Sequence, residues 1–222
     1  MKLLTQALTK FIAGLLLMGL LLFVPAGTLH YFGGWLLMGI LFIPMLILGV
    51  LLFCKEPALL QKRLDAKESD STQKKVVALS GLGFLAQFVL AGLDFRFGWL
   101  PPVPRWGTLL AAAFFLAGYV LYGFVMKQNA YLSRSVRVQE GQRVIDTGLY
   151  GVVRHPMYGA TLLLFAAMPL VLGSWLAFLL FFHYPPLLAV RIRKEEQLLA
   201  QQLEGYTDYQ KKVPYKVIPG IW

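Results

Sequence analysis

Residues 11–54 form a stretch of 44 residues that contains no Asp, Glu, Lys or Arg. A chain of 222 residues has too small an interior to bury so much apolar surface in a soluble fold. Hydrophobic residues make up 58% of the chain and charged residues 14%, against about 45–50% and about 25% in soluble domains. The same figures exclude a disordered or collagen-like chain. We therefore expect an all-α integral membrane protein.

The apolar runs predict the number of membrane helices. A helix needs about 20 apolar residues to cross the bilayer, and the runs at 11–24, 34–54, 76–93 and 106–126 each predict one transmembrane helix. A turn is expected between the first two runs, at Pro25, Gly27, His30 and Gly33. Two lysines precede the first run, as in a signal peptide, but the second run follows so closely that we expect a retained helix.

The positive charges predict the orientation. The net charge is +10, and 19 of the 21 Lys and Arg residues lie in the N-terminal segment, in the loops 55–75 and 127–155, and in the tail after residue 190. Only Arg96 and Arg105 lie between the third and fourth runs. Because cytoplasmic loops carry the excess of Lys and Arg, the N-terminus and these loops should be cytoplasmic, in a bacterial inner membrane or its equivalent. The charge therefore requires no nucleic-acid partner.

The last apolar run, residues 156–190, must enter the membrane and return, because Arg154 and Arg191 flank it and should share a side. Its 35 residues are few for two crossings and a turn. A break is predicted near Pro169, Gly173 and Ser174. We expect a membrane helical hairpin, tilted or ending short of the far surface, whose tip other helices cover.

Beyond the hairpin, residues 191–212 alternate polar and apolar side chains at helical spacing, which predicts a cytoplasmic amphipathic helix that ends near Gly205. The chain then divides into two regions. Residues 1–126 would be a four-helix scaffold through which a substrate enters, and residues 127–222, with the hairpin 156–190, would carry the chemistry.

The segment just before the hairpin, residues 146–159, is rich in polar and aromatic groups. Its glycines permit close backbone approach to a ligand, its tyrosines offer flat faces and hydroxyls, and Pro156 should push the backbone of His155 out of the helical region. These features predict a polar pocket at the membrane boundary. The alternative is an ordinary interfacial loop whose Arg and Tyr side chains anchor the membrane.

The segment just after the hairpin places Arg191 and Glu195 four residues apart, so they share a helix face, and Glu196 follows. Adjacent carboxylates at this position could hold a cationic ligand, and the alternative is a solvated ion pair. A single cysteine and the lack of Cys/His pairs at metal-ligand spacing predict no metal site.

These motifs together resemble a family of integral-membrane methyltransferases that includes isoprenylcysteine carboxyl methyltransferase and the phospholipid N-methyltransferases. The resemblance consists of Arg154-His155-Pro156-Met157-Tyr158, the apolar run to residue 190, and Glu195-Glu196, with Thr147-Gly148-Leu149-Tyr150 before and Gly205-Tyr206, Tyr209 and Val213-Pro214 after. It covers residues 130–220, about 40% of the chain. The N-terminal half agrees only in having several membrane helices.

The resemblance implies that S-adenosyl-L-methionine is the methyl donor, bound at the cytoplasmic end of the hairpin. Arg191 matches the arginine that the family assigns to the carboxylate of the acceptor. A family glutamine that touches the cofactor falls on Ser135, which is a departure from the pattern. The residues implied to contact the cofactor are Gln142, Arg143, Val144, Ile145, Tyr150, His155, Pro156, Met157, Tyr158 and Glu195.

The residue types suit this chemistry. Methyl transfer is an in-line displacement, for which alignment and exclusion of water matter most. Glu195 can pair with the cofactor ammonium group, and Tyr150 can pack on adenine. A carboxylate acceptor could be oriented by Arg191 without a base, whereas an amine or thiol would need one, with Glu196 or His155 as candidates.

The expected partners are an amphipathic or lipid-like acceptor and membrane lipid, with no nucleic acid and no metal. Two alternatives stay open. The membrane sterol reductases have a related C-terminal half and use NADPH, although adjacent carboxylates would repel a nucleotide phosphate. A non-enzymatic transporter or scaffold is the other, although few polar groups lie inside the spans. Within the third apolar run, Gly81 and Gly83 predict close helix packing, and Gln87 predicts an interhelical hydrogen bond.

Overall fold

The protein is an all-α integral membrane protein. The computed structural model describes residues 2–64, 70–132 and 138–222, with the side chains of Lys2 and Lys62 left out, and all the regular structure in these ranges is helical. Five helical stretches within them are long and apolar enough to cross a membrane. They are α1 (Lys2–Ala26), α2 (Phe32–Lys55), α4 (Ser71–Phe97), α5 (Arg105–Gln128), and α7 (Trp175–Phe181) together with α8 (Tyr184–Gln202). The shorter elements are α3 (Pro57–Leu64), the 3₁₀ turn η1 (Gly148–Gly151), α6 (Pro156–Val171) and α9 (Tyr206–Lys212).

The four predicted transmembrane helices are present but longer than the apolar runs. The helix α4, for example, begins at Ser71, where the Asp70 carboxylate accepts the backbone N–H of Gln73 at 2.8 Å. The helices extend into polar sequence at their ends, which a count of apolar residues cannot detect. The same limit explains why α3, inside the polar loop 55–75, was not predicted.

The turn between α1 and α2 is shorter than expected. It begins at Gly27, whose φ of 68° is the left-handed conformation that favours glycine. Pro25 lies in the last turn of α1, and Gly33 lies inside α2, so the prediction that these two residues form the turn was wrong. A Cβ at Gly33 would lie 2.8 Å from the carbonyl oxygen of Val171, so this glycine instead lets α2 approach the hairpin closely.

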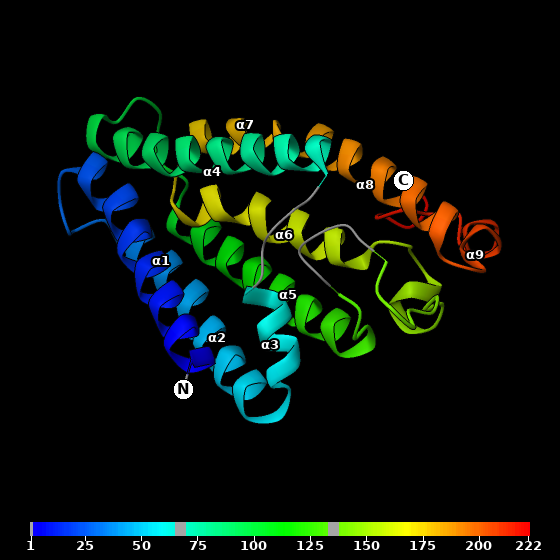
Figure 1. Ribbon diagram of the computed structural model, residues 1–222. Coiled ribbons are helices and arrows are strands. Elements are labelled where there is room, and N and C mark those ends of the chain that lie inside the picture. Colours follow the sequence, from blue (N-terminus) through cyan, green and yellow to red (C-terminus); the bar gives the residue numbers. More distant parts are fainter. Residues whose placement is uncertain (1, 65–69, 133–137) are drawn as a thin grey trace.

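The predicted hairpin is confirmed. The entering arm is α6 and the returning arm is α7 followed by α8, with the break at residues 172–174. Gly173 adopts a positive φ of 80°, and the Ser174 hydroxyl caps α7 by accepting the N–H of Ala177 at 3.1 Å. Figure 1 shows α6 in the middle of the bundle, with α7 and α8 running alongside α4.

Other helices cover the hairpin tip, as predicted. The Tyr31 hydroxyl donates to the carbonyl of Leu172 at 2.6 Å, and the N–H of Val103 donates to the carbonyl of Gly173 at 3.0 Å. Buried Ser174 donates to the Asp94 carboxylate at 2.6 Å. The tip therefore reaches the level at which α2 and α5 begin and α4 ends.

Contacts in the core follow the predictions only partly. The Gln87 side chain donates to the carbonyl of Ala177 at 2.8 Å, which confirms the expected interhelical hydrogen bond. A Cβ at Gly83 would overlap the ring of His183, whereas one at Gly81 would meet nothing within 4 Å. Close packing is thus confirmed for Gly83 and wrong for Gly81.

The predicted amphipathic helix over 191–212 is two helices. Its first part is the end of α8, which stops at Gln202, close to the predicted end near Gly205. Gly205, with a φ of 79°, is also the residue at which the second helix, α9, begins. The bend turns the tail back toward the start of the hairpin. There the N–H groups of Arg154 and His155 donate to the carbonyls of Tyr215 and Lys216 at 3.0 and 2.7 Å.

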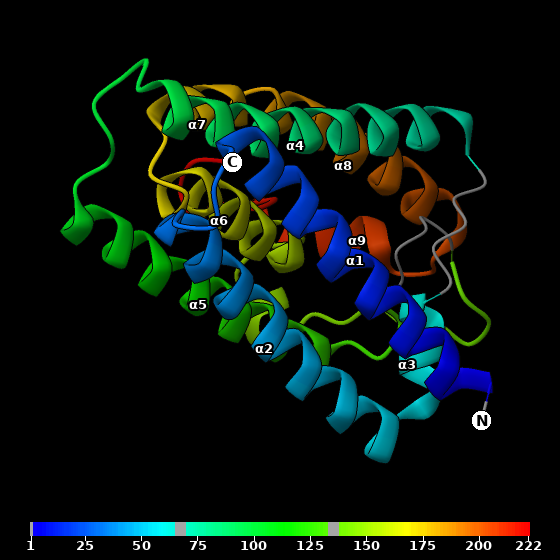
Figure 2. The same cartoon turned by 90° about the vertical axis from the view of Figure 1, so that its left-hand side faces the viewer.

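The polar connections meet at one end of the bundle, which we call the site end. Lys10 near the N-terminus donates to the carbonyl of Leu64 at 2.5 Å, and the Gln73 side chain donates to the carbonyl of Arg191 at 3.2 Å. Figure 2 shows the N-terminus, α3 and α9 toward this end, opposite the α4–α5 connection. That this end faces the cytoplasm stays a prediction, and Lys67, Arg134 and Arg137 lie outside the described residues.

Candidate active site

A cavity of about 430 Å³ opens at the site end, between the start of the hairpin, the end of α8 and the segment before the hairpin. It brings together almost all the predicted site residues, although they are spread over more than 50 positions of the sequence. Pro156 and Glu196 are the two predicted residues that do not line it. The predicted residues in its wall are Gln142, Arg143, Val144, Ile145, Tyr150, His155, Met157, Tyr158, Arg191 and Glu195.

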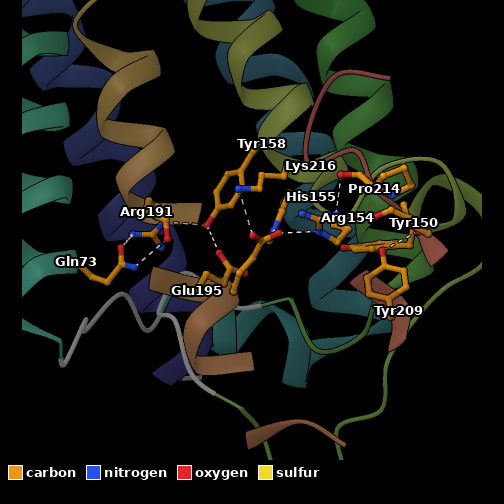
Figure 3. Close-up of polar contacts among 12 residues, drawn as sticks. Gln73, Tyr150, Arg154, His155, Tyr158, Arg191, Glu195, Tyr209, Pro214 and Lys216 are labelled. Carbon is orange, nitrogen blue, oxygen red and sulfur yellow. Dashed lines mark hydrogen bonds and ion pairs between the residues drawn. The ribbon is translucent and has the colours of Figure 1, made fainter. Parts of the chain in front are cut away.

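Glu195 ends a chain of hydrogen bonds that runs through Tyr158 and Arg191 to Gln73 along one wall (Figure 3). The Tyr158 hydroxyl donates to the Glu195 carboxylate at 2.5 Å and accepts the Nε–H of Arg191 at 3.0 Å. Arg191 in turn donates to the side-chain oxygen of Gln73 at 3.2 Å. The tyrosine thus fixes both an anionic and a cationic group, each of which also faces the cavity.

Glu196 occupies a different environment although it is the next residue. Its carboxylate is buried, 2.7 Å from Arg154 Nε, 3.2 Å from His155 Nε2 and 3.5 Å from Lys216 Nζ. Residues on one helix turn by about 100° per position, so consecutive side chains point to different faces. Here Glu195 faces the cavity and Glu196 faces the protein. This geometry leaves Glu196 poorly placed to accept a proton from a bound ligand.

Arg154 joins the start of the hairpin to the tail. Beside its ion pair with Glu196, it donates to the carbonyls of Val213 and Pro214 at 2.6 and 2.8 Å. These charge-assisted bonds account for the family-like pattern of an Arg-His-Pro start, a carboxylate after the hairpin and a Val-Pro tail. Arg154 and His155 therefore hold the tail against the start of the hairpin, and they also line the cavity.

His155 lies between this network and the cavity. Its backbone, at φ −128° and ψ 60°, is outside the helical region, as predicted for the residue before a proline. The ring is buried, and its Nε2 faces Glu196 rather than the cavity. A role of His155 as a base would therefore have to involve a ring position other than this one.

Tyr150 is buried beside the segment that precedes the hairpin. Its hydroxyl accepts the side-chain N–H of Asn129 at 3.0 Å, and its carbonyl accepts the hydroxyl of Tyr209 at 2.7 Å. Burial raises the pKa of Tyr150 to about 12, so the phenol is neutral near pH 7. A neutral ring fixed at two points suits stacking against a flat group.

The glycines of this segment serve the protein more than a ligand. Gly148 has a φ of 60°, and a Cβ there would lie 2.7 Å from the side chain of Gln128. A Cβ at Gly151 would lie 3.1 Å from the carbonyl of Asp146. At these two positions, the predicted close approach is therefore to neighbouring protein atoms.

Ser135, where the pattern departs from the family, lies outside the described residues.

Several residues of the cavity wall carry no sequence signal that we recognised. Arg63 and Tyr122 come from the N-terminal half, and Leu203 follows the end of α8. Gln73, which holds Arg191, is 118 residues away from it in sequence. The polar character of Gln73 close to an apolar run was the one available hint.

A second, mostly apolar cavity of about 300 Å³ lies between α4, α6 and α8. Two residues, Val77 and Arg191, line both cavities, so the two adjoin. The remaining wall residues of the second cavity come from membrane-spanning segments and are Val76, Ser80, Gly81, Phe84, Phe165, Tyr184 and Leu188.

Known proteins resemble this chain over the region that contains most of the site. Residues 110–201 match the model of the isoprenylcysteine carboxyl methyltransferase family, which supports a membrane methyltransferase-like function. The chain is 24% identical over 135 residues to a Delta(14)-sterol reductase of Methylotuvimicrobium alcaliphilum, covering 54% of this chain and 32% of that protein. It is 32% identical over 85 residues to the Delta(14)-sterol reductase TM7SF2 of Mus musculus, covering 37% and 20%. The chain thus spans about a third or less of these relatives, which belong to the same superfamily. The chain is thus similar to the isoprenylcysteine carboxyl methyltransferase family over residues 110–201, which contain most of the site.

Proposed function

We propose that the protein transfers the methyl group of S-adenosyl-L-methionine to an amphipathic acceptor that partitions into the membrane. The proposal rests above all on Glu195, a carboxylate in the wall of the cavity within the region that matches the family. The cofactor carries an ammonium group, for which this carboxylate is the natural partner. Because Glu196 is held by internal ion pairs, Glu195 is the member of the pair that can fill this role.

The residues present fit the cofactor. A cavity of about 430 Å³ is within the usual range of about 300–1,000 Å³ for ligand pockets. Tyr150 offers an aromatic face, and the segment 142–145 lines the same wall. When bound, S-adenosylmethionine would supply a methyl group on a positively charged sulfur. The chain would then supply alignment and exclusion of water.

The geometry favours an acceptor that needs no base, such as a carboxylate. Of the two bases considered from the sequence, His155 Nε2 and Glu196 face each other at 3.2 Å. Arg191 lines the cavity beside Tyr158 and can present a planar guanidinium to a carboxylate. An amine or thiol acceptor would require a proton acceptor that these contacts do not offer.

The apolar cavity supports a lipid-like acceptor. It meets the polar cavity at Arg191, so a molecule could place a polar group at Arg191 while its apolar part lies among Phe84, Phe165 and Leu188. Burial of apolar surface contributes about 25 cal/mol per Å², so even a short chain would add substantially to binding.

A reductase that uses NADPH is the second candidate, because both relatives described above are sterol reductases. Its cofactor would place phosphates in the cavity, where arginines would attract them and Glu195 would repel them. A transporter or scaffold has less support, because the polar groups gather at one end of the bundle instead of along a path through it.

Calorimetry on the full-length protein in detergent separates these candidates. S-adenosylhomocysteine should bind, and Glu195→Gln should weaken it by about tenfold or more, as expected for the loss of a charged hydrogen bond. Glu204→Gln, an exposed change of the same chemistry, is the matched control. Binding of NADPH without binding of S-adenosylhomocysteine would overturn the proposal in favour of the reductase.

A further inference from the structure

Arg63 reaches the cavity from α3, a helix of the N-terminal half that no motif predicted. It lines the wall, and its guanidinium lies over the ring of Tyr122, 5.3 Å from the ring centre. Its Nε and Nη2 atoms are shielded from solvent and have no hydrogen-bond partner among the residues that the structure describes.

The neighbouring arginine of the same wall behaves differently. Arg154 donates from Nε to Glu196 and from Nη1 to two backbone carbonyls. The ring of Tyr122 attracts the face of the Arg63 guanidinium but offers no acceptor to the N–H groups at its edge. A shielded, charged donor without an acceptor is costly, so Arg63 is a group that a bound anion would stabilise.

The charges of the cavity point the same way. Its described lining contains four arginines, Arg63, Arg143, Arg154 and Arg191, but one carboxylate, that of Glu195. A methyl donor with a sulfonium and an ammonium group adds further positive charge. The filled site therefore needs anionic groups from its ligands, and a planar guanidinium binds carboxylate or phosphate oxygens in pairs.

We propose that Arg63 is an oxyanion-binding residue of this site, which holds a carboxylate or phosphate group of a bound ligand from the side of α3. The inference rests on the proposed function in so far as the ligand is the methyl donor or its acceptor. The oxyanion could belong to either of them, and the two sources can be separated by experiment.

The experiment compares the wild type, Arg63→Gln and Arg63→Lys as full-length proteins in detergent, with Arg193→Gln as a control that removes an exposed positive charge from α8. Calorimetry measures the affinity for S-adenosylhomocysteine and for its analogue without the carboxylate. If Arg63 holds the cofactor carboxylate, Arg63→Gln should lower the affinity for S-adenosylhomocysteine about ten- to a hundredfold and leave the affinity for the analogue unchanged. The affinity of Arg63→Lys should lie between those of the wild type and Arg63→Gln, because lysine keeps the positive charge but cannot donate two parallel hydrogen bonds.

If S-adenosylhomocysteine is unaffected, dodecanoate, dodecyl phosphate and dodecanol are titrated into the protein saturated with it. Arg63→Gln should then weaken the two anions and not the alcohol, which assigns the oxyanion to the acceptor. Should the wild type bind NADPH and not S-adenosylhomocysteine, the proposed function fails, and a weaker binding of NADPH by Arg63→Gln still supports the role of Arg63. Unchanged affinity for every probe, or no binding of any probe by the wild type, would overturn the inference. Thermal denaturation of each variant shows whether it is folded.

Discussion

The second carboxylate of the Glu-Glu pair provides a sharp test of the site, because the structure gives it a structural role. Replacing Glu196 by Gln leaves a side chain of the same shape but removes the negative charge that faces Arg154, His155 and Lys216 at 2.7, 3.2 and 3.5 Å. Arg154 and Glu196 are both less than 10% exposed, so water cannot replace the lost partner.

The expected loss of stability follows from this burial. Breaking a buried ion pair by removing one partner costs about 3–5 kcal/mol. The amide can still accept one hydrogen bond, and Arg154 keeps its bonds to Val213 and Pro214, so we expect about 3–4 kcal/mol. For a chain of this size that corresponds to a decrease of about 6–16 °C in the melting temperature.

The assay is scanning fluorimetry in detergent, with Glu195→Gln and Glu204→Gln measured in parallel. Glu195→Gln should lose ligand affinity with little loss of stability, because its carboxylate lines the cavity, and Glu204→Gln should change neither. The reasoning is refuted if Glu196→Gln melts within about 2 °C of the wild type. If that variant also bound S-adenosylhomocysteine normally but did not transfer methyl groups, Glu196 would be the base and not a structural residue.

Three further changes test other parts of the molecule. Gly81→Trp should fill the apolar cavity and lower the rate of methyl transfer to membrane acceptors at least about tenfold, because the acceptor loses apolar burial. The affinity for S-adenosylhomocysteine, measured by calorimetry, should not change. Loss of both activity and affinity would show that the substitution disturbs the fold. Gly148→Ala should lower the free energy of unfolding by about 1–3 kcal/mol in fluorimetry, because of the positive φ and the contact with Gln128; an unchanged melting temperature would contradict this. Lys212 lowers the pKa of Asp146, so the pair stabilises the folded state above the ordinary Asp pKa of about 3.9 and this contribution is lost as the pH falls. Asp146→Asn should therefore differ from the wild type in melting temperature at neutral pH and converge with it below about pH 4, whereas a constant difference would exclude the ion pair as its cause.

The hairpin and most of the cavity wall could be predicted because they follow from the positions of charged residues and of turn residues in the sequence. Positive charges on both flanks of residues 156–190 require the run to return. Gly173 and Ser174 mark where it turns, whereas Pro169 lies inside α6. Once the run returns, His155 and Glu195 must meet at one end of the bundle. The motif then identifies which residues face the ligand.

The contributions of the N-terminal half could not be predicted in this way. Arg63 lines the cavity from α3 and lies over Tyr122 of α5, and Gln73 reaches Arg191 because α4 packs against α8. Nothing in the local sequence of Arg63 or Gln73 distinguishes them from other polar residues near a membrane boundary. The end of α8 near Gly205 was predicted, but the short helix α9 that follows it was not. Tertiary contacts, such as that between Tyr209 and Tyr150, decide the direction that the tail takes.

The different roles of the two glutamates, by contrast, follow from helix geometry that the sequence already contains. Positions four apart share a helix face, so Glu195 belongs with Arg191 and Glu196 belongs with Ile192, which is fully buried. A carboxylate on the face of a buried isoleucine must be paired with internal groups, and Glu196 meets the Arg154 guanidinium and the His155 ring at the start of the hairpin. The Glu-Glu pair thus combines two functions in consecutive residues: the second carboxylate holds the two ends of the hairpin together, and this in turn fixes the first one at the wall of the cavity.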